Sequence, residues 1–431
     1  MFDRRRPAVT VIIPTYNWSS ALKCAIRSVL LQTLQDFEIL VVGDGCTDDS
    51  EAVVAAFADS RIRWHNLPRN YGSQWAANNY GLEIASGDWI AYLGHDDIWH
   101  PRHLAAVTET ARRERADIVT STLITYGPPG SRVRGVAGIF PNGAFGENDF
   151  VPPSAVSHAK RLYGDGIVWR DPDTVATPMD AAFLNDLCLA RLRFGATNEL
   201  TVFKFNAAYR RDSYRIRSTE EQEAILRRIE AGIDVRQGEL HGVIEAMVSG
   251  LFLQPQPFAP SAEKGAVVRR NRALKGVASR YRSDDLIRVE VATRFDMSAQ
   301  EAPFEWYALE TTPEGSTFRW SGPSRRATID LPVIVDRDLA VSLHILMALR
   351  PDTIAATKLS IHERPLTVAV RPDGPGATLE TVIRPADLAD NGRDFGITLE
   401  AAALLRPCDI GASDDRRWLG VAVDWVELRP L

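Results

Sequence analysis

The sequence contains little cysteine. Four cysteines occur in 431 residues, and no two of them form a CxxC pair: Cys24, Cys46, Cys188 and Cys408. Zinc knuckles and disulfide frameworks both require closely spaced or paired cysteines, so this spacing favours neither. We therefore expect free thiols and a reducing compartment.

Long apolar stretches are lacking as well. The chain has no run of about 18 apolar residues, the length that spans a bilayer. Near the N-terminus, the apolar run Val9–Ile13 is too short for the core of a signal peptide. These absences predict a cytoplasmic protein, with any membrane contact peripheral and on the inner face.

The sequence also has no excess of positive charge. Its formal net charge is -6, and no basic domain dominates, which disfavours nucleic-acid binding. A hydrophobic content of 45% and a charged content of 25% are typical of a soluble globular protein. The length of 431 residues predicts two or three domains.

The first quarter of the chain alternates between the periods of strands and helices. Short segments rich in β-branched or aromatic residues predict strands at Val9–Ile13, Phe37–Val42, Ile62–Asn66, Trp89–Leu93 and Asp117–Ser121. Apolar residues at helical spacing lie between them, at residues 19–32, 48–58, 73–85 and 101–115. This alternation predicts an α/β fold with a doubly wound, mostly parallel sheet.

The rest of the chain has a different pattern. Residues 126–178 have the glycine and proline content of a long loop, and helices are predicted at Met179–Arg191 and Glu220–Ile233. A proline-rich linker, Gln254–Pro260, precedes a basic segment that favours a solvated connecting helix. Short strands recur beyond it and predict an all-β sandwich. The predicted domains are residues 1–253 and 286–431, with a linker and connecting helix at 254–285.

Polar residues follow three of the predicted parallel strands. Tyr16, Asp44 and Asp96 come shortly after the first, second and fourth strands. Ligands of open α/β sheets bind outside the carboxyl ends of the strands. We therefore expect these three side chains to reach one rim of the sheet.

Helix capping is the alternative explanation for neighbouring residues. Asn17 and Ser19 suit the start of the first helix, and residues 47–49 suit the start of the second. Asp44 lies between two glycines, where a backbone can approach a ligand closely, and this favours a functional role. The GDG sequence lacks the third glycine of a dinucleotide-binding fingerprint.

The adjacent Asp96 and Asp97 cannot point the same way from an extended backbone. Pro101 suits a first helical turn, so Asp97 is expected to stabilise the start of that helix. Asp96 is then the better ligand for Mn²⁺ or Mg²⁺, which bind one or two carboxylates plus phosphate oxygens. A zinc site at His95 and His100 would need more ligands than this region offers.

Three stretches together resemble a known family. VTVIIPTYN, QDFEILVVGDGCTDDS and RNYGSQWAANNYGLEIASGDWIAYLGHDD are similar, in order and spacing, to the N-terminal half of GT-A fold, family 2 glycosyltransferases. The likeness is close over residues 8–126 and looser as far as Arg217. It implies transfer of a sugar from a nucleotide-diphosphate donor to an acceptor hydroxyl, with inversion at the anomeric carbon.

The resemblance also implies site residues. The implied nucleotide-sugar-binding set is Pro14, Tyr16, Asn17, Asp44, Arg69, Asn70, His95 and Asp96. Asp44 matches the aspartate that hydrogen-bonds the base. GHDD matches the metal motif, in which Gly94 replaces the first acid and Asp96 remains as the metal ligand.

The family's catalytic base lies near the start of a helix, and Asp180 in PMDAAFL matches it best. Ala182 stands where the family often has a second acid, and first-turn stabilisation of the helix is the structural explanation for Asp180. Asp171 and Asp173 are the alternative bases. Further residues could neutralise a diphosphate or form exposed salt bridges: His158, Lys204, Arg210 and Arg211.

The C-terminal part resembles, more weakly, β-sandwich accessory domains appended to bacterial glycosyltransferases. Trp306, Trp320 and Trp418 fit either a glycan-stacking face or a core, of which the core is the commoner. The role of this domain does not follow from the sequence.

The sequence thus predicts a metal-dependent inverting glycosyltransferase in surface-polysaccharide or related glycan assembly. Its partners would be a UDP-, GDP- or dTDP-sugar and a glycan or lipid-linked acceptor. One rival hypothesis is a non-catalytic glycan- or nucleotide-sugar-binding protein, motivated by Gly94 and Ala182. Another is a nucleotidyltransferase, which would need a phosphate loop that PTYN does not provide. The sugar, the linkage and the oligomeric state stay open.

Overall fold

The computed structural model describes residues 6–140, 145, 149–190, 192–253, 263–278, 281, 283–298, 300, 304–388 and 395–431. The chain forms two compact units. The first comprises Met1–Pro129, Arg134–Met247 and Phe252–Ala278, and the second comprises Gly130–Val133, Val248–Leu251 and Ser279–Leu431. Each unit has its own hydrophobic core.

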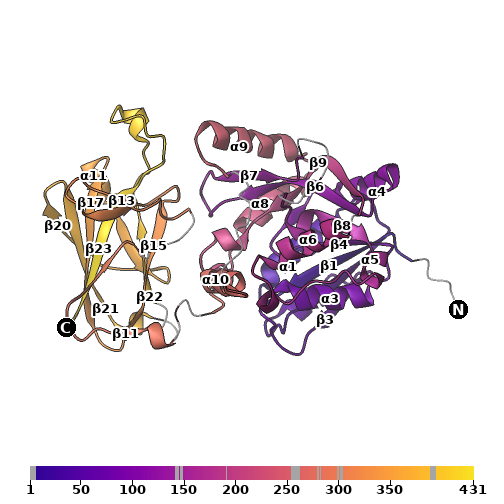
Figure 1. Ribbon diagram of the computed structural model, residues 1–431, viewed down its shortest axis with the longest axis horizontal. Coiled ribbons are helices and arrows are strands. Elements are labelled where there is room, and N and C mark those ends of the chain that lie inside the picture. The colour runs from indigo at the N-terminus through magenta and orange to yellow at the C-terminus, as the bar shows by residue number, and fades with distance from the viewer. Residues whose placement is uncertain are drawn as a thin grey trace. The chain divides into compact units, whose positions relative to one another are not determined.

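A ten-stranded mixed sheet forms the centre of the first unit, in the order β10-β7-β6-β8-β4-β1-β2-β3, with β5 and β9 joined to it (Figure 1). Its N-terminal part is parallel. β1 (Val9–Thr15) lies between β2 (Phe37–Gly43) and β4 (Trp89–Tyr92), and β3 (Ile62–Asn66) pairs with β2. Every residue of β1 is buried, as expected for a strand covered on both faces. The predicted α/β fold is confirmed.

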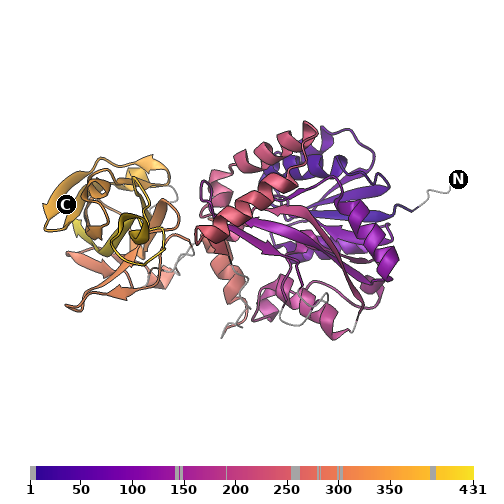
Figure 2. The same cartoon turned by 90° about the horizontal axis from the view of Figure 1, so that it is seen from above.

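Four helices connect the N-terminal strands: α1 (Ser19–Leu30), α2 (Ser50–Ala55), α3 (Gln74–Ile84) and α4 (His103–Glu114). The buried residues of α1 include Ala21, Ile26 and Val29, whose helical spacing predicts this helix. Figure 2 shows helices on both sides of the sheet.

The later strands of this unit add antiparallel pairing. β6 (Ile118–Tyr126) pairs with β7 (Arg134–Ala137) and β8 (Val156–Ala159), and β8 also pairs with β4. β9 (Phe194–Lys204) runs parallel to β6 and antiparallel to β5 (Ile98–Trp99). The prediction of a long loop over residues 126–178 was therefore wrong in part. Strands of four residues are too short to show a clear alternating pattern.

The same part of the chain holds short helical elements: η1 (Pro153–Ala155), α5 (Arg161–Gly164), η2 (Pro172–Thr174), η3 (Ala207–Tyr209) and α7 (Ser213–Ile216). The two predicted longer helices are confirmed as α6 (Met179–Leu189) and α8 (Glu220–Glu230). The unit ends with α9 (Arg236–Val248), β10 (Phe252–Leu253) and α10 (Ala266–Leu274). The predicted linker Gln254–Pro260 lies outside the described residues.

The second unit is a β-sandwich. A seven-stranded antiparallel sheet has the order β13-β14-β23-β17-β21-β20, with β12 paired to β23, and a four-stranded sheet has the order β15-β22-β18-β19. The first sheet contains β12 (Thr293–Asp296), β13 (Glu310–Thr311), β14 (Thr317–Trp320), β17 (Leu339–Ala348), β20 (Ala369–Asp373), β21 (Gly376–Ile383) and β23 (Val421–Pro430). The second contains β15 (Arg326–Leu331), β18 (Lys358–Ile361), β19 (Arg364–Pro365) and β22 (Phe395–Glu400).

A few further elements complete this unit: the paired β11 (Ile287–Arg288) and β16 (Val333–Ile334), α11 (Pro351–Ala355), η4 (Ser283–Asp285), η5 (Pro385–Asp387) and η7 (Pro407–Ile410). Ile329 and Leu399 of one sheet share a core with Val341 and Val423 of the other, which confirms the predicted sandwich.

Two of the three tryptophans considered for a glycan-stacking face lie in the core of the sandwich. Trp306 and Trp320 are 7% and 6% exposed, and the Trp306 indole donates to the Thr328 carbonyl at 2.9 Å. These two residues are therefore core residues. Trp418 is half-buried, with the Arg406 guanidinium 5.0 Å from its ring centroid.

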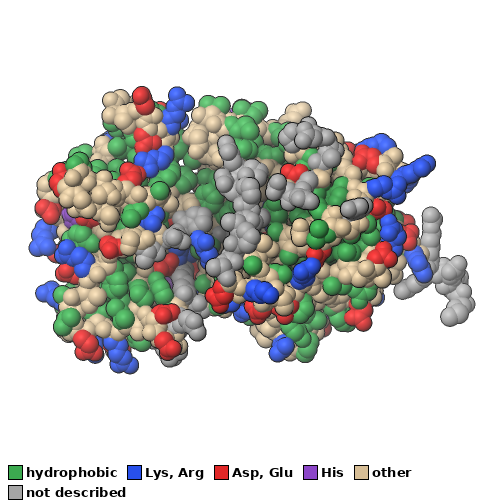
Figure 3. Space-filling model, viewed as in Figure 1, with side chains coloured by type: hydrophobic (Ala, Val, Ile, Leu, Met, Phe, Trp, Pro, Cys, Tyr) green, Lys and Arg blue, Asp and Glu red, His purple; other side chains and the backbone are tan. Residues whose placement is uncertain are grey.

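Two surface properties bear on the predicted partners. On the face shown in Figure 3, acidic and basic side chains are interspersed. Among the helices within the described ranges, none has both the length and the apolar character that a membrane crossing requires.

Candidate active site

The carboxyl ends of β1, β2 and β4 lie next to one another. The three strands run parallel with β1 in the middle, and Thr15 is in register with Gly43 at the ends of β1 and β2. The residues that leave these strands therefore start side by side. The strand exits that carry Tyr16, Asp44 and Asp96 are adjacent, as the sequence pattern predicted.

Asn17 connects the first strand exit to the second. Its φ is 43°, and its side-chain oxygen accepts hydrogen bonds from the N–H groups of Thr47, at 2.7 Å, and Asp48, at 3.2 Å. Asp48 accepts from the N–H groups of Ser19 and Ser50, the first residues of α1 and α2. Asp48 thus caps both helices, and the suggestion that Asn17 caps α1 was wrong. Its nucleotide contact stays a prediction.

Asp44 holds the loop that follows β3. Its side chain is buried, and its two carboxylate oxygens accept from the N–H groups of Tyr71, at 2.9 Å, and Gly72, at 3.0 Å. Burial raises the pKa of Asp44, and the two backbone hydrogen bonds and Arg272 only partly offset that effect.

Gly45 brings the Arg69–Asn70 backbone against the Asp44 loop. Its φ is 69°, and an added Cβ would overlap the backbone of both residues. Gly45 therefore allows the loop after β2 to approach the loop after β3 closely, whereas the sequence suggested a close approach to a ligand. The Arg69 guanidinium lies 4.7 Å from the ring centroid of Tyr71, and Asn70 Oδ1 is buried without a hydrogen bond from the described residues. A buried amide oxygen without a partner is costly, so Asn70 retains capacity for a ligand.

Asp97 lies in a buried ion pair. Its carboxylate accepts from the Ser154 hydroxyl, from the Lys204 ammonium at 3.0 Å and from the Phe205 N–H at 3.0 Å. Burial raises the pKa of Asp97, although Lys204 lowers it. Because β5 intervenes and α4 begins only at His103, the prediction that Asp97 stabilises the start of that helix was wrong.

The Asp96 carboxylate, unlike that of Asp97, is not held by neighbouring side chains within the described ranges. Asp96 is half-buried, and among the described residues its carboxylate takes part in no hydrogen bond or ion pair, although its backbone carbonyl accepts from Gln222 at 3.1 Å. Gly94 makes room for this arrangement. An added Cβ at Gly94 would lie 3.0 Å from Asp97 Oδ2 and 3.1 Å from Asp96 Oδ1, which is tighter than ordinary contact. A larger residue at position 94 would therefore displace one of the two carboxylates.

His95 packs in an aromatic cluster with Trp18 and Tyr214. Its ring centroid lies 5.8 Å from that of each neighbour, and its Nε2 lies 3.3 Å from the Tyr214 hydroxyl. Burial lowers the pKa of His95, which favours the neutral ring. His100 lies 3.5 Å from Asp234 instead. Within the described ranges, no three His, Cys, Asp or Glu side chains are grouped as a metal site would require.

Asp180 is the second residue of α6, and the charges of Lys204 and Lys275 act on it. Its carboxylate accepts from the N–H of Ala181 at 3.1 Å. Burial raises the pKa of Asp180, and the charges of Lys204 and Lys275 lower it. Burial lowers the pKa of Lys275, and the charge of Asp96 opposes that effect there as it does at Lys204, whose pKa is raised. Two carboxylates and two ammonium groups thus interact at the carboxyl end of β4.

A comparison with protein-family models agrees with this geometry. The model described as Glycosyl transferase family 2 matches residues 10–215, a segment that includes all three strand exits and Asp180. Residues 10–215 belong to this family. The GT-A fold expected from the sequence motifs is therefore the fold of the first unit.

Curated relatives are similar to part of this chain. Succinoglycan biosynthesis protein ExoO of Rhizobium meliloti is 36% identical over 128 residues, which cover 30% of this chain and 36% of that protein. An uncharacterized glycosyltransferase of Rickettsia typhi is 35% identical over 98 residues, which cover 23% of this chain and 30% of that protein. The chain therefore spans less than two thirds of the length of these relatives.

A solved structure of S. aureus TarS in complex with UDP-GlcNAc is similar at 18% identity and a TM-score of 0.39, over 46% of this chain and 58% of that chain. At that score the likeness is too distant to support an inference about this protein.

Two predicted charged residues of the family 2 domain have structural roles. His158 Nε2 lies 2.8 Å from the Tyr92 hydroxyl, and burial lowers the pKa of His158 to about 4. Arg210 is 6% exposed and pairs with Glu221 at 2.8 Å. Neither side chain is exposed, so an exposed salt bridge was the wrong alternative for both.

The alternative bases lie elsewhere in the domain. Asp171 caps η2 by accepting from the N–H of Asp173 at 2.9 Å, and Asp173 is exposed. Asp180 is among the largest electrostatic influences on Lys204 and Lys275, whereas Asp171 and Asp173 are not. Asp180 stays the favoured base, and that role stays a prediction.

The sequence pattern missed the contribution of α10. The segment Ala266–Ala278 belongs to the first unit, and an added Cβ at Gly72 would overlap the guanidinium of Arg272. No residue of α10 (Ala266–Leu274) is buried, which is consistent with the expected solvated helix, although Arg272 reaches Gly72. The signal available in the sequence was the density of basic residues, which is equally typical of a solvated helix.

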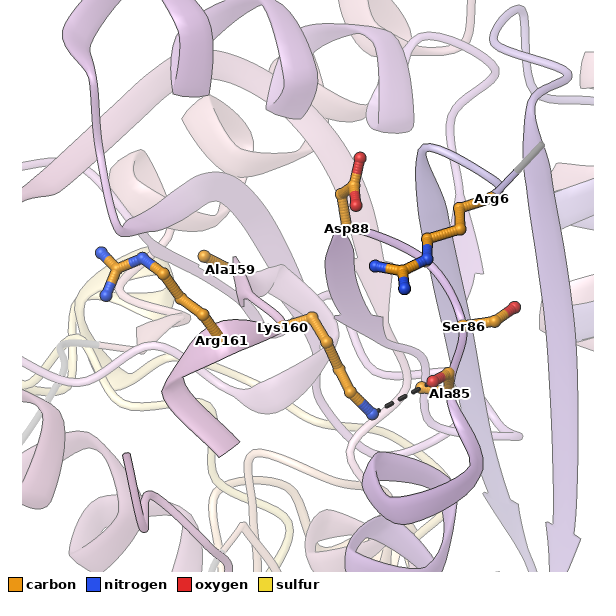
Figure 4. Close-up of a pocket in the computed structure, with 8 residues that line it drawn as sticks. Arg6, Ala85, Ser86, Asp88, Ala159, Lys160 and Arg161 are labelled. Carbon is orange, nitrogen blue, oxygen red and sulfur yellow. Dashed lines mark hydrogen bonds between the residues drawn. The ribbon is translucent and has the colours of Figure 1, made fainter. Parts of the chain in front are cut away.

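A cavity of about 610 Å³ lies at the amino ends of the parallel strands, opposite the candidate site. Figure 4 shows its lining, which includes Arg6, Asp88 and Lys160 near the amino ends of β1 and β4. Lys160 Nζ donates to the carbonyls of Leu82 and Ala85. Because the polar strand exits are at the other edge, this cavity is separate from the candidate site of the family 2 domain.

Proposed function

We propose that the first unit is an inverting glycosyltransferase that moves a sugar from a nucleotide-diphosphate sugar to an acceptor hydroxyl. The observation that carries this proposal is the convergence of Asp44, Asp96 and Asp180 in a family 2 domain. ExoO is named for succinoglycan biosynthesis, which supports bacterial surface polysaccharide or a related glycan as the acceptor class.

The nucleoside is assigned to the Asp44 side of the rim. Tyr16, Asn70 and the stacked Arg69–Tyr71 pair offer aromatic and polar groups there, and Pro14 is a buried residue near the end of β1. Asp44 fixes the 71–72 backbone through both oxygens, so we expect it to shape the base pocket as well as to contact the base.

The residues on the Asp96 side fit Mn²⁺ or Mg²⁺. These ions are commonly held by one or two carboxylates, with donor phosphate oxygens and water completing the coordination. Asp96 has an unengaged carboxylate, whereas Asp97 and His95 are held by neighbours. When bound, the cation would supply positive charge to the leaving diphosphate.

Asp180 is assigned as the general base. It would take the proton of the acceptor hydroxyl while that oxygen bonds to the anomeric carbon and the carbon–oxygen bond to the diphosphate breaks. Burial raises the pKa of Asp180, which favours its acceptance of a proton, and the charges of Lys204 and Lys275 only partly offset that rise.

The test is a donor screen of the full-length protein. UDP-, GDP- and dTDP-sugars would be incubated with Mn²⁺ or with a chelator, and nucleoside-diphosphate release and calorimetric binding would be measured. We expect one nucleotide class to bind in a Mn²⁺-dependent way. Absence of binding by all three classes would reject the proposal, and equal binding with chelator would reject the metal.

A further inference from the structure

The helix α10 lies outside the segment that the family model matches, yet its C-terminal end is attached to the candidate site. The Leu274 carbonyl accepts from the N–H of Asp212 at 2.9 Å, and the Lys275 carbonyl accepts from the N–H of Tyr214 at 3.1 Å. Tyr214 belongs to the aromatic cluster of His95. These two backbone hydrogen bonds fix where the Lys275 side chain begins.

The helix also contacts the nucleotide side of the site. The Arg272 guanidinium covers Gly72, the residue whose N–H binds Asp44, and leaves no space there for a Cβ. Arg272 and Lys275 are three residues apart and therefore lie on the same face of the helix end. One face of α10 is thus directed toward both halves of the rim.

Lys275 is held close to the carboxylates without pairing to one. Its ammonium lies 5.8 Å from the ring centroid of Tyr214, and Asp96 and Asp180 both act on its charge. Among the described residues, no hydrogen bond or ion pair engages this ammonium. The other lysines near the sheet behave differently, because Lys204 pairs with Asp97 and Lys160 donates to two carbonyls. An ammonium held in place but unpaired can bind an incoming anion without first breaking an ion pair.

We propose that Lys275 binds the diphosphate of the nucleotide-sugar donor, so that a helix outside the matched family segment completes the donor site. This inference rests on the proposed function, since the diphosphate is the anion expected beside Asp96. The Lys275 ammonium would then neutralise part of the negative charge of the diphosphate. Without it, a cation bound to Asp96 would have to neutralise that charge alone.

The test compares nucleoside diphosphates with the corresponding nucleosides. Calorimetry would measure the binding of UDP, GDP and dTDP, and of uridine, guanosine and thymidine, to the full-length protein with Mn²⁺. The variants are Lys275→Gln, the conservative Lys275→Arg and the matched control Lys264→Gln, an exposed lysine on the same segment. Thermal melting would confirm that each variant folds.

We expect Lys275→Gln to weaken diphosphate binding about 10- to 100-fold, the loss that corresponds to one charged hydrogen bond. Nucleoside binding should be unchanged, Lys275→Arg should retain most of the diphosphate affinity, and Lys264→Gln should match the wild type. Equal diphosphate binding by Lys275→Gln and the wild type would overturn this inference alone. An equal loss of diphosphate affinity in Lys264→Gln would also overturn it, because that result would show a general effect of positive charge. Absence of diphosphate binding by the wild type would instead reject the proposed function.

Discussion

Charged side chains at the rim of the first unit differ from those in a turn of the β-sandwich. In the β-sandwich, the Arg417 guanidinium is bound by Asp415 at 2.7 Å and Glu310 at 2.6 Å. At the rim of the first unit, Asp96 and Lys275 have no such partner among the described residues. Paired charges mainly stabilise a fold, whereas charges held near each other but unpaired retain the capacity to bind a ligand. The predictions below would break or sharpen this contrast.

The largest expected effect is on turnover. Asp180→Asn removes a proton acceptor without changing the size of the side chain, so transfer should slow by about 10²- to 10⁴-fold. Donor binding, measured by calorimetry, should stay within about twofold, because Asp180 is not assigned to the donor (a change within roughly 0.5 kcal/mol). An unchanged rate would move the assignment to Asp171 or Asp173.

The next prediction compares how much Asp97 and Asp96 each contribute to the free energy of unfolding. Asp97→Asn would leave the Lys204 ammonium without its charge partner in a buried position, which should lower the free energy of unfolding by about 3–5 kcal/mol. Asp96→Asn, the matched control, should change it by less than about 0.5 kcal/mol. Urea unfolding followed by circular dichroism measures both. Equal losses of unfolding free energy in the two variants would mean that Asp96 also stabilises the fold.

Metal-dependent donor binding provides the third comparison. Asp96→Ala should weaken binding of the nucleotide-sugar in the presence of Mn²⁺ by at least about 100-fold, because the cation would lose its carboxylate ligand. With a chelator present, the variant and the wild type should bind alike. A variant that keeps its response to Mn²⁺ would place the cation on another residue.

Acid should destabilise the first unit through its buried histidines. The pKa of His158 in the folded protein is lowered to about 4 from an ordinary value of 6.5. Its contribution to stability is therefore complete above pH 6.5 and is lost as the pH falls from 6.5 toward 4, by an amount on the order of 3 kcal/mol. Urea midpoints at pH 7 and pH 4.5 should differ less in His158→Gln than in the wild type. The exposed His241→Gln should retain the wild-type dependence.

The smallest effect is expected in the β-sandwich. Arg417→Ala removes two ion pairs from a partly exposed turn and should cost at most about 1 kcal/mol. Nucleotide binding should not change. A loss of donor affinity in this variant would show that paired charges of the second unit also serve the site, and would end the contrast between the units.

Local sequence patterns predicted the backbone of the parallel core well. β1 to β4 and α1 to α4 occur close to the predicted ranges, because the period of buried residues follows directly from the geometry of strands and helices. β9 was not predicted, since its sequence FGATNELTVFK mixes polar residues with apolar ones and its pairing with β6 contains register shifts. Its place in the sheet depends on β6 and β5, which lie far away in the sequence.

The same distinction holds for the candidate site. The sequence by itself determined the strand exits, and with them the shared rim of Tyr16, Asp44 and Asp96, because parallel strands place their carboxyl ends together. Only the tertiary structure decided which of two neighbouring carboxylates is engaged. Lys204 arrives on β9 and pairs with Asp97, whereas Lys275 arrives on α10 and stays unpaired. Periodicity reports which face of an element is buried, but the partner of a charge is set by elements that pack there from distant parts of the chain.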